Sequence, residues 1–413
     1  MARLQVNHVK SVAKMLLAKK SSKNTVAQSF GLCSVCSHAL STPTWCQSCQ
    51  AAYFQSFFST WSSSSPALNT LIQQSQLNAQ HEHDYVEWIN YDRIEQVRLL
   101  NKGHFGVVYK AIWLDGPRKV WDEKKGWTRS GCTKIVMKAL NDDNNMSSFD
   151  EIMRELDTNI KCSSQARGVL RCYGITKDPS TDTYMLVLEC CANGDLRKFL
   201  QTSFSTLDWP TRLSILHSII SGIRIIHDKG YVHRDIHSGN VFIKANLTAL
   251  VGDLGLCRSA DEPFAKAKIN GILPYIAPES LIGFGFSKAS DIYAFGILMW
   301  ELSTGTTPFS YRAYDDELSY DICNGTRPRI QVGTPSRYMR LMQKCWAEDP
   351  EVRPSAEEVC AIIEQWLHED GAKQVEACEE KIKPSEEKIK PSGGWMNRIR
   401  KRGCGVKVAN DNM

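Results

Sequence analysis

The stretch Tyr231-Val232-His233-Arg234-Asp235-Ile236-His237-Ser238-Gly239-Asn240 decides the fold of this chain. It places an aspartate five residues before an asparagine. A carboxylate at the first position can hold the proton of a hydroxyl group, and an amide at the second can hold a magnesium ion. A ten-residue pattern of this kind can arise by chance. Its value as evidence therefore depends on matching segments at the right distances on both sides.

Matching segments occur on both sides and in the right order. Upstream, Leu100–Tyr109 is typical of two strands joined by a tight glycine turn, where missing side chains let backbone amides approach phosphate oxygens. An apolar strand then leads to Lys138, which can reach phosphate groups. Downstream, Asp253 supplies a second carboxylate, Pro274–Glu279 closes the loop after it, and Asp291–Gly296 opens an apolar helix.

Together these segments resemble a eukaryotic protein kinase from Tyr91 to Leu367. The block from Cys345 to Pro354 resembles tyrosine kinases and the tyrosine-kinase-like group more than other kinases. The resemblance implies an α+β fold of two lobes. One is a small antiparallel β lobe with one helix, and the other is larger and mainly helical.

The resemblance also implies a role for each matching residue. Asp235 would be the catalytic carboxylate, Lys138 would neutralise phosphate charge, and Asn240 and Asp253 would hold magnesium. ATP would be bound by residues on both sides of the adenine and by the glycine turn: Asn101, Gly103, Gly106, Val108, Lys138, Glu189, Cys191 and Phe242.

Lys138 needs a carboxylate partner, because a long flexible ammonium must be oriented before it can serve the phosphates. Glu151 and Glu155 lie four residues apart on one face of the following helix, so periodicity cannot separate them. The distance along the chain to Cys172-Tyr173-Gly174 favours Glu155.

The lower lobe carries two further expectations. Glu279 should pair with Arg353, as the kinase pattern implies. The apolar stripe Leu216, Ile219, Ile223 and Ile226 recurs at helical spacing and predicts a core-facing helix.

Three positions depart from the kinase pattern. Asn101 replaces the first glycine of the turn, His237 stands where serine/threonine kinases carry lysine, and Gly239 stands where many tyrosine kinases carry arginine. We predict a serine/threonine kinase, with tyrosine or dual specificity as the alternative. A second alternative is a pseudokinase scaffold, which Asn101 and His237 favour.

The head of the chain carries Cys33-x-x-Cys36, nine residues, then Cys46-x-x-Cys49. Two such pairs can complete a tetrahedral structural zinc site, and some fungal kinases of the tyrosine-kinase-like group resemble this layout. We expect a small module that contacts a protein partner. No basic residue occurs between Lys23 and Arg93, so nucleic acid is the weaker partner. A third alternative function is a partner-binding protein that acts through this module, with the kinase as its regulator. Deleting residues 1–60 would then remove partner binding and retain phosphate transfer.

Composition indicates the general class of protein and its compartment. The chain has 413 residues, of which 42% are hydrophobic and 23% charged, and no stretch predicts a membrane span. Of its 15 cysteines, the eleven outside these two pairs form no paired framework of the kind found in small secreted proteins, which indicates a reducing compartment. We therefore expect a cytoplasmic protein, with the nucleus as the alternative compartment.

Charge and composition also predict the boundaries. Residues 1–30 form a basic segment, 31–52 the four-cysteine zinc knuckle, 53–90 a Ser/Gln/Asn-rich linker, 91–367 the kinase domain, and 368–413 a disordered tail with a tandem heptapeptide and a basic cluster. The basic start fits a targeting segment, a contact to nucleic acid or a membrane surface, or a solvated tail. The oligomeric state stays open.

Overall fold

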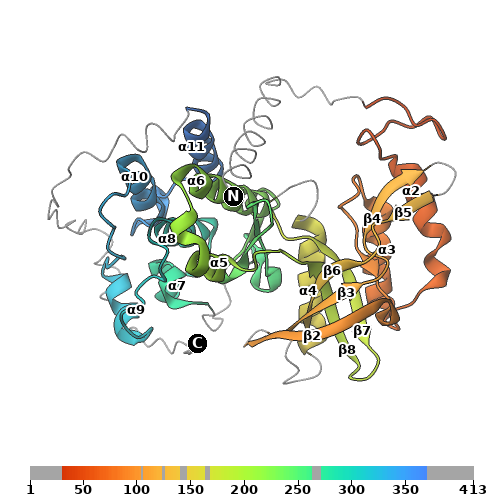
Figure 1. Ribbon diagram of the computed structural model, residues 1–413, viewed down its shortest axis with the longest axis horizontal. Helices are drawn as coiled ribbons and strands as arrows, with labels where there is room; N and C mark the ends of the chain where they lie inside the picture. The colour runs from red at the N-terminus through yellow and green to blue at the C-terminus, as the bar shows by residue number, and fades with distance from the viewer. Residues whose placement is uncertain are drawn as a thin grey trace. The chain divides into compact units, whose positions relative to one another are not determined.

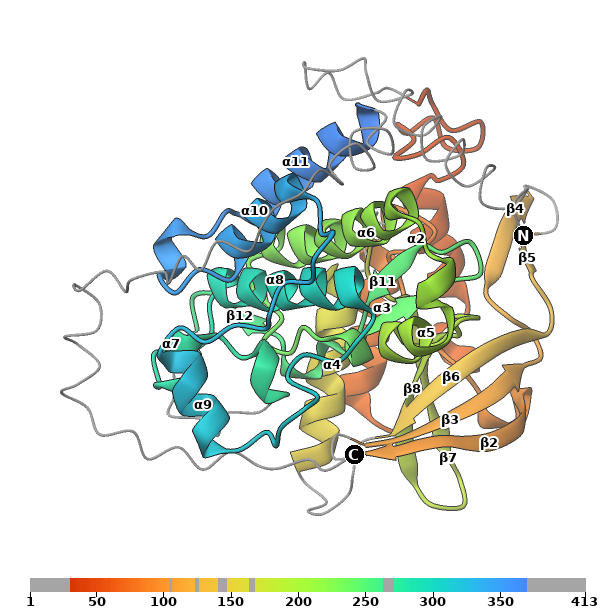
Figure 2. The ribbon, with the colours of Figure 1, turned by 60° about the vertical axis from the view of Figure 1, so that its left-hand side comes forward.

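The computed structural model describes residues 30–103, 106–122, 126–139, 147–162, 168–262 and 271–369. They form two compact units, the first ending at Cys190 and the second beginning at Cys191. Figures 1 and 2 show that the first is built on a β-sheet and the second mainly on helices. The basic segment before Phe30 and the tail after Glu369 lie outside the described residues.

The first unit contains a six-stranded sheet in the order β1-β7-β8-β6-β3-β2. Its strands are β1 Glu87–Trp88, β2 Ile94–Gly103, β3 Gly106–Trp113, β6 Thr133–Ala139, β7 Cys172–Asp178 and β8 Thr183–Glu189. All neighbours pair antiparallel except β1, which runs parallel to β7. The expected antiparallel lobe is present, with this one parallel strand added.

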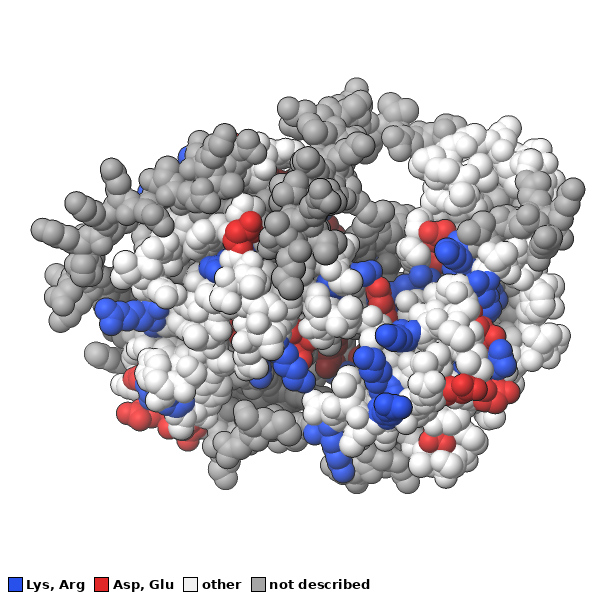
Figure 3. All heavy atoms as spheres, in the orientation of Figure 1, with Lys and Arg blue, Asp and Glu red and all other residues white. Residues whose placement is uncertain are grey.

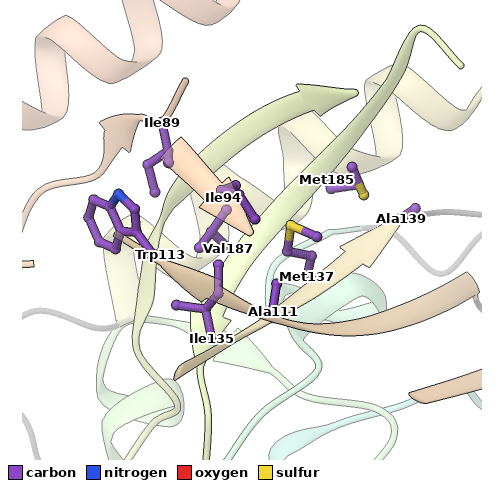
Figure 4. Close-up of a cluster of buried hydrophobic side chains, with 9 residues drawn as sticks. All are labelled: Ile89, Ile94, Ala111, Trp113, Ile135, Met137, Ala139, Met185 and Val187. Atoms are coloured by element: carbon purple, nitrogen blue, oxygen red, sulfur yellow. The ribbon is translucent and has the colours of Figure 1, made fainter. Parts of the chain in front are cut away.

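Alternating side chains give the sheet two distinct faces. Ile135, Met137 and Ala139 of β6 join a buried cluster on one face (Figure 4). The full cluster is Ile89, Ile94, Ala111, Trp113, Ile135, Met137, Ala139, Met185 and Val187. Lys138 falls between two of these positions on β6 and therefore belongs to the opposite face.

Residues 53–90 do not form the predicted linker. After α2, Gln47–Ser56, the chain forms a short 3₁₀ turn at Phe58–Thr60 and then α3, Pro66–Asn78. The Ser65 side chain caps α3, and Leu68 and Ile72, four residues apart on one face, are fully buried. The composition resembled a linker because most of the α3 sequence is polar, and its fully buried apolar side chains are these two. The one helix expected in the small kinase lobe is α4, Ser147–Cys162, and α2 and α3 precede that lobe in the described part of the first unit.

An aromatic cluster joins this N-terminal segment to the rest of the first unit. Trp45, Phe54, Ala79 and Tyr85 form its buried core. The Trp45 ring lies 6.0 Å from the Tyr85 ring and 5.7 Å from that of Trp127. Trp127 belongs to a hairpin inserted between β3 and β6, formed by β4 Arg118–Asp122 and β5 Gly126–Arg129. The four-cysteine segment and the sheet are therefore one folded body.

The second unit is mainly helical. Its helices are α5 Leu196–Ser203, α6 Trp209–Asp228, α7 Pro278–Leu281, α8 Lys288–Thr304, α9 Asp316–Cys323, α10 Ser336–Cys345 and α11 Ala356–His368. Four short strands form two antiparallel pairs, β10 Val241–Ile243 with β11 Ala249–Val251 and β9 Tyr231–Val232 with β12 Arg258–Ser259. The predicted apolar stripe of α6 is confirmed, since all four of its residues are fully buried.

Helix α8 forms the centre of the second unit. Every residue from Ser290 to Ser303 is buried. A capping box at Ser287 begins the helix, and Gly305, in a left-handed conformation, ends it. The predicted pair of Glu279 with Arg353 is confirmed, with Nη1 to Oε1 at 2.6 Å and Nη2 to Oε2 at 2.8 Å. None of the helices in the described part of the chain is long and apolar enough to cross a membrane.

Candidate active site

The candidate phosphate-binding turn lies in the hairpin of β2 and β3. Asn101 pairs with Val108, and Gly103 pairs with Gly106 at the last described position of the hairpin. Gly106 has φ 143°, a backbone conformation that favours glycine. His104 and Phe105 lie outside the described residues. The hairpin brings together Asn101, Gly103 and Gly106, predicted for the turn, and Val108, predicted to contact the adenine.

Lys138 and Glu155 form a buried ion pair in the same unit. The Lys138 Nζ lies 3.0 Å from each carboxylate oxygen of Glu155, and the exposed fractions of the two side chains are 9% and 2%. Register places Lys138 opposite Val108 of the glycine hairpin. Glu151, one turn earlier on α4, is exposed. The prediction that Glu155 is the partner is confirmed.

The predicted adenine-binding residues belong to both units. Leu188 and Glu189 end β8, and the Glu189 N–H donates to the carbonyl of Arg171 at 2.9 Å. That N–H is therefore already engaged by protein. In the second unit, Phe242 lies at the centre of β10 and pairs with Leu250 of β11. Cys191, the first residue of this unit, is half-buried.

The second unit holds the catalytic loop, residues 233–240. The Asn240 amide nitrogen donates to the Asp235 carbonyl and to the Asp235 carboxylate, at 2.9 Å each. Because the nitrogen makes both bonds, the amide oxygen of Asn240 is the atom that can face a cation. The predicted acid and amide are thus brought into direct contact.

A buried acid on α8 holds the start of this loop. The Asp291 carboxylate accepts from the backbone N–H groups of His233 and Arg234, at 2.8 and 3.0 Å, and contacts His227 Nε2 at 2.8 Å. Arg234 has φ 72°, which is costly for a residue with a side chain. The bonds to Asp291 stabilise this conformation and so fix the direction in which Asp235 leaves the backbone.

Two departures from the kinase pattern prove to be coupled. His237 Nδ1 accepts from the Gly239 N–H at 3.0 Å, so the proton of a neutral ring lies on Nε2, which is 3.5 Å from Asp235 Oδ2. A Cβ at Gly239 would lie only 2.9 Å from His237 Cε1. A side chain at position 239 would therefore force the His237 ring to shift.

Asp253 is positioned by the pairing of β10 with β11. Val241 pairs with Val251, so Asn240 precedes one strand while Asp253 follows the other. The Gly252 N–H donates to the Asn240 carbonyl at 2.9 Å, and His233 Nε2 contacts the Gly252 carbonyl at 3.1 Å. Asp253 has a left-handed backbone with φ 60°. The register of β10 against β11 thus holds Asn240 and Asp253, the two predicted magnesium ligands, at the same end of one strand pair.

Sequence reasoning missed a buried network beneath the loop. Ser238 Oγ donates to Glu301 of α8 at 2.8 Å, and the Tyr275 hydroxyl donates to the other carboxylate oxygen. Burial raises the pKa of the Glu301 carboxyl and, more strongly, that of the Tyr275 hydroxyl. Ser238 and Glu301 are 63 residues apart, so no local pattern could have linked them.

The four predicted metal-ligating cysteines also come together. Cys36 Sγ lies 3.4 Å from Cys46 Sγ and 3.3 Å from Cys49 Sγ, and Cys33 Sγ lies 3.7 Å from Cys49 Sγ. All four are free thiols whose sulfurs lie within 4.8 Å of one another. The first pair lies on a turn in which Ser37 has φ 58°, and the second begins α2.

Comparisons with known proteins agree with this arrangement. The family model described as protein tyrosine and serine/threonine kinase matches residues 94–363. A Dictyostelium discoideum protein named "Probable serine/threonine-protein kinase" is 27% identical over 299 residues, covering 69% of this chain and 16% of that protein. A second from the same organism, named "Probable LIM domain-containing serine/threonine-protein kinase", is 31% identical over 271 residues, covering 65% and 38%.

The chain therefore spans less than two fifths of the length of either relative. The family model, however, covers well over half of this chain and includes all the catalytic residues predicted above. The chain belongs to the protein tyrosine and serine/threonine kinase family.

Proposed function

We propose that this chain is an ATP-dependent protein kinase that transfers the γ-phosphate of ATP to serine or threonine hydroxyls of a protein substrate. The observation that carries the proposal is the contact between Asp235 and Asn240, on a loop fixed from below by Asp291. The intact pair of Lys138 and Glu155 supports it, because a scaffold has no need of a buried charge pair.

Each residue has a proposed task. Asp235 orients the attacking hydroxyl and accepts its proton, Lys138 binds phosphate oxygens, and Glu155 positions Lys138. Asn240 and Asp253 are the residues that would hold magnesium, which supplies positive charge to the phosphates when bound. An amide oxygen and a carboxylate fit this hard cation.

The nucleotide contacts are also proposed. The backbone at Asn101, Gly103 and Gly106 approaches the phosphates. The adenine is bound by side-chain contacts of Val108 and Phe242 and by backbone groups of Glu189 and Cys191.

The serine/threonine preference and the tyrosine-kinase-like group belong to the proposal. The names of both relatives support the hydroxyl class. The coupled His237 and Gly239 support it as well, since Gly239 removes the arginine that many tyrosine kinases carry there. We also propose a cytoplasmic protein, with the nucleus as the alternative, on the basis of its cysteine usage.

We further propose that Cys33, Cys36, Cys46 and Cys49 hold a structural zinc ion. Four sulfurs at about 2.3 Å from one ion would lie about 3.8 Å apart, close to the separations between these thiols. Contacts to His38 lower the pKa of the Cys36 thiol to about 6, whereas burial raises those of Cys46 and Cys49. A bound dication would stabilise all four thiolates.

Zinc content measured by mass spectrometry tests this site. We expect one zinc per chain, lost in Cys33→Ser and retained in Cys132→Ser, which alters an exposed cysteine of the same unit. Equal zinc in both variants, or none in the parent, would contradict the assignment.

A protein partner is the favoured contact for this segment. Residues 30–81 contain no charged side chain, and the corresponding surface in Figure 3 is white.

The kinase proposal is tested by transfer of labelled γ-phosphate to a generic protein substrate and to the chain itself, followed by phosphoamino-acid analysis. We expect label on serine or threonine, and a rate about 10²–10⁴-fold lower in Asp235→Asn. Asp228→Asn, an exposed aspartate at the end of α6, is the matched control. Label on tyrosine would reverse the hydroxyl class, and no label despite ATP binding would favour the scaffold.

A further inference from the structure

The first unit contains a cavity whose lining includes none of the predicted catalytic or nucleotide-binding residues. It has a volume of about 330 Å³, within the range of small-molecule sites, and its lining residues run from Tyr53 to Arg129. One wall comes from α2 and the turn after it, and the other from β1, β3 and the β4–β5 hairpin. It exists because residues 53–90 are folded against the sheet.

The two walls differ in chemistry. The N-terminal wall presents the aromatic rings of Tyr53, Phe57 and Trp61 and carries no charge. Indole rings also line the opposite wall, at Trp88 and Trp113. Flat apolar faces on both sides favour a flat aromatic guest.

All the charges lie on the opposite wall. Arg93 pairs with Asp115 at 2.6 Å, and Arg129 pairs with Glu87. This leaves Arg118, whose closest carboxylate oxygen is Glu87 Oε2 at 3.7 Å. Three guanidinium groups against two carboxylates give the lining one positive charge in excess.

Arg118 is incompletely satisfied. Its Nη1 is buried and has no hydrogen-bond partner among the described residues. Its guanidinium lies over the Phe54 ring, 4.6 Å from the centroid, which orients the cation without satisfying its donors. A buried donor without a partner is uncommon in a folded protein, and it adds to a positive charge that an anionic ligand in the cavity would balance.

We propose that this cavity binds a small aromatic anion, an aryl phosphate or aryl carboxylate, with the ring between the aromatic walls and the anionic group at Arg118. A ring alone would leave the excess positive charge of the lining unbalanced, and an inorganic anion alone would leave the aromatic faces unfilled. The proposal is independent of phosphate transfer, because neither Asp235 nor Lys138 lines this cavity.

Intrinsic fluorescence gives a direct assay, since Trp61, Trp88, Trp113 and Trp127 all line the cavity. The full chain, with ATP and magnesium saturating any nucleotide site, is titrated with phenyl phosphate and with benzoate. Inorganic phosphate and benzyl alcohol are the matched probes for charge alone and ring alone. We expect saturable quenching by an aryl anion, and binding at least about tenfold weaker for each matched probe.

Two variants locate the site. Arg118→Gln should weaken binding of the aryl anion about tenfold or more, while Arg98→Gln, an exposed arginine of the same unit outside the cavity, should leave it unchanged. Trp61→Ala, which removes a half-buried ring and no charge, should also weaken binding of the aryl anion. It provides an independent test of the cavity if the arginine variant misfolds. No saturable quenching, equal binding of inorganic phosphate, or full binding by either cavity variant would overturn the proposal.

Discussion

The two units hold their functional side chains by different means. In the second unit the catalytic loop is fixed by hydrogen bonds to two buried acids on one helix, Asp291 and Glu301 of α8. In the first unit Lys138 and Glu155 meet because a strand and a helix pack together, and that packing extends to the N-terminal segment. The loop is positioned by polar contacts, whereas the small unit depends on aromatic packing between segments far apart in sequence.

The N-terminal segment reaches the helix that carries Glu155. Helix α3 contacts α4, and the Tyr184 hydroxyl donates to the Ser63 carbonyl at 2.9 Å. The Tyr184 ring lies 5.1 Å from the ring of Phe149 on α4. Substitutions far from the catalytic residues should therefore act through stability in the first unit, and substitutions in the second should act through local geometry.

The largest effect on stability is expected from Trp45→Ala. Trp45 is 1% exposed and contacts Phe54, Tyr85 and Trp127, so its removal should lower the free energy of unfolding by about 3–5 kcal/mol. Phe57→Ala, at the end of α2 and 42% exposed, should cost much less. Guanidinium unfolding measures both, and equal costs would refute the aromatic core.

A smaller loss of stability, with a loss of transfer, is expected from Glu155→Gln. This change removes the carboxylate charge that Glu155 places beside the buried Lys138 ammonium, which costs about 3 kcal/mol. Transfer should slow because Lys138 is no longer oriented. Glu151→Gln, one turn away and exposed, is the matched control for steady-state rates and unfolding. Similar rates in the two variants would show that the pair is not needed for transfer.

In the second unit, Gly239→Ala should change the geometry of the catalytic loop more than the stability of the fold. The new Cβ would press on the His237 ring, at a cost of about 1–3 kcal/mol, and turn Nε2 away from Asp235. His237→Ala removes the ring, so adding Gly239→Ala to it should have little further effect on transfer. Additive losses in this double-mutant cycle would contradict the coupling.

The smallest effect is expected from Tyr184→Phe, which removes one hydroxyl and keeps the ring. Loss of the bond to Ser63 should cost about 1 kcal/mol, since a hydrogen bond is exchanged for one with water. Tyr311→Phe, at an exposed tyrosine of the second unit, should be neutral in the same thermal unfolding experiment. A neutral Tyr184→Phe would remove this contact from the link to α4.

The sequence was most informative where function depends on short motifs. The catalytic loop, the Lys138 strand and the pair of Glu279 with Arg353 could be predicted because their spacing is set by local chemistry. The choice between Glu151 and Glu155 needed only one additional distance along the chain.

Sequence reasoning failed where long-range packing decides the structure. Residues 53–90 have the composition of a linker, yet Leu68, Ile72 and Tyr85 are buried by partners elsewhere in the unit. The Arg118 cavity was missed for the same reason, because its walls come from segments well separated in sequence, such as Tyr53–Trp61 and Arg118–Arg129. Periodicity describes one helix or strand and cannot identify the surface that covers it.

The most direct test of this account is to delete residues 1–60 and measure thermal unfolding and γ-phosphate transfer beside the full chain. The deletion removes Trp45 and Phe54 and uncovers Trp127 and Tyr85, so we predict a lower unfolding midpoint and slower transfer. A shortened chain that unfolds at the same temperature and transfers phosphate at the same rate would contradict the account. That result would support the sequence-based prediction that the N-terminal segment is an independent module joined to the kinase domain by a linker.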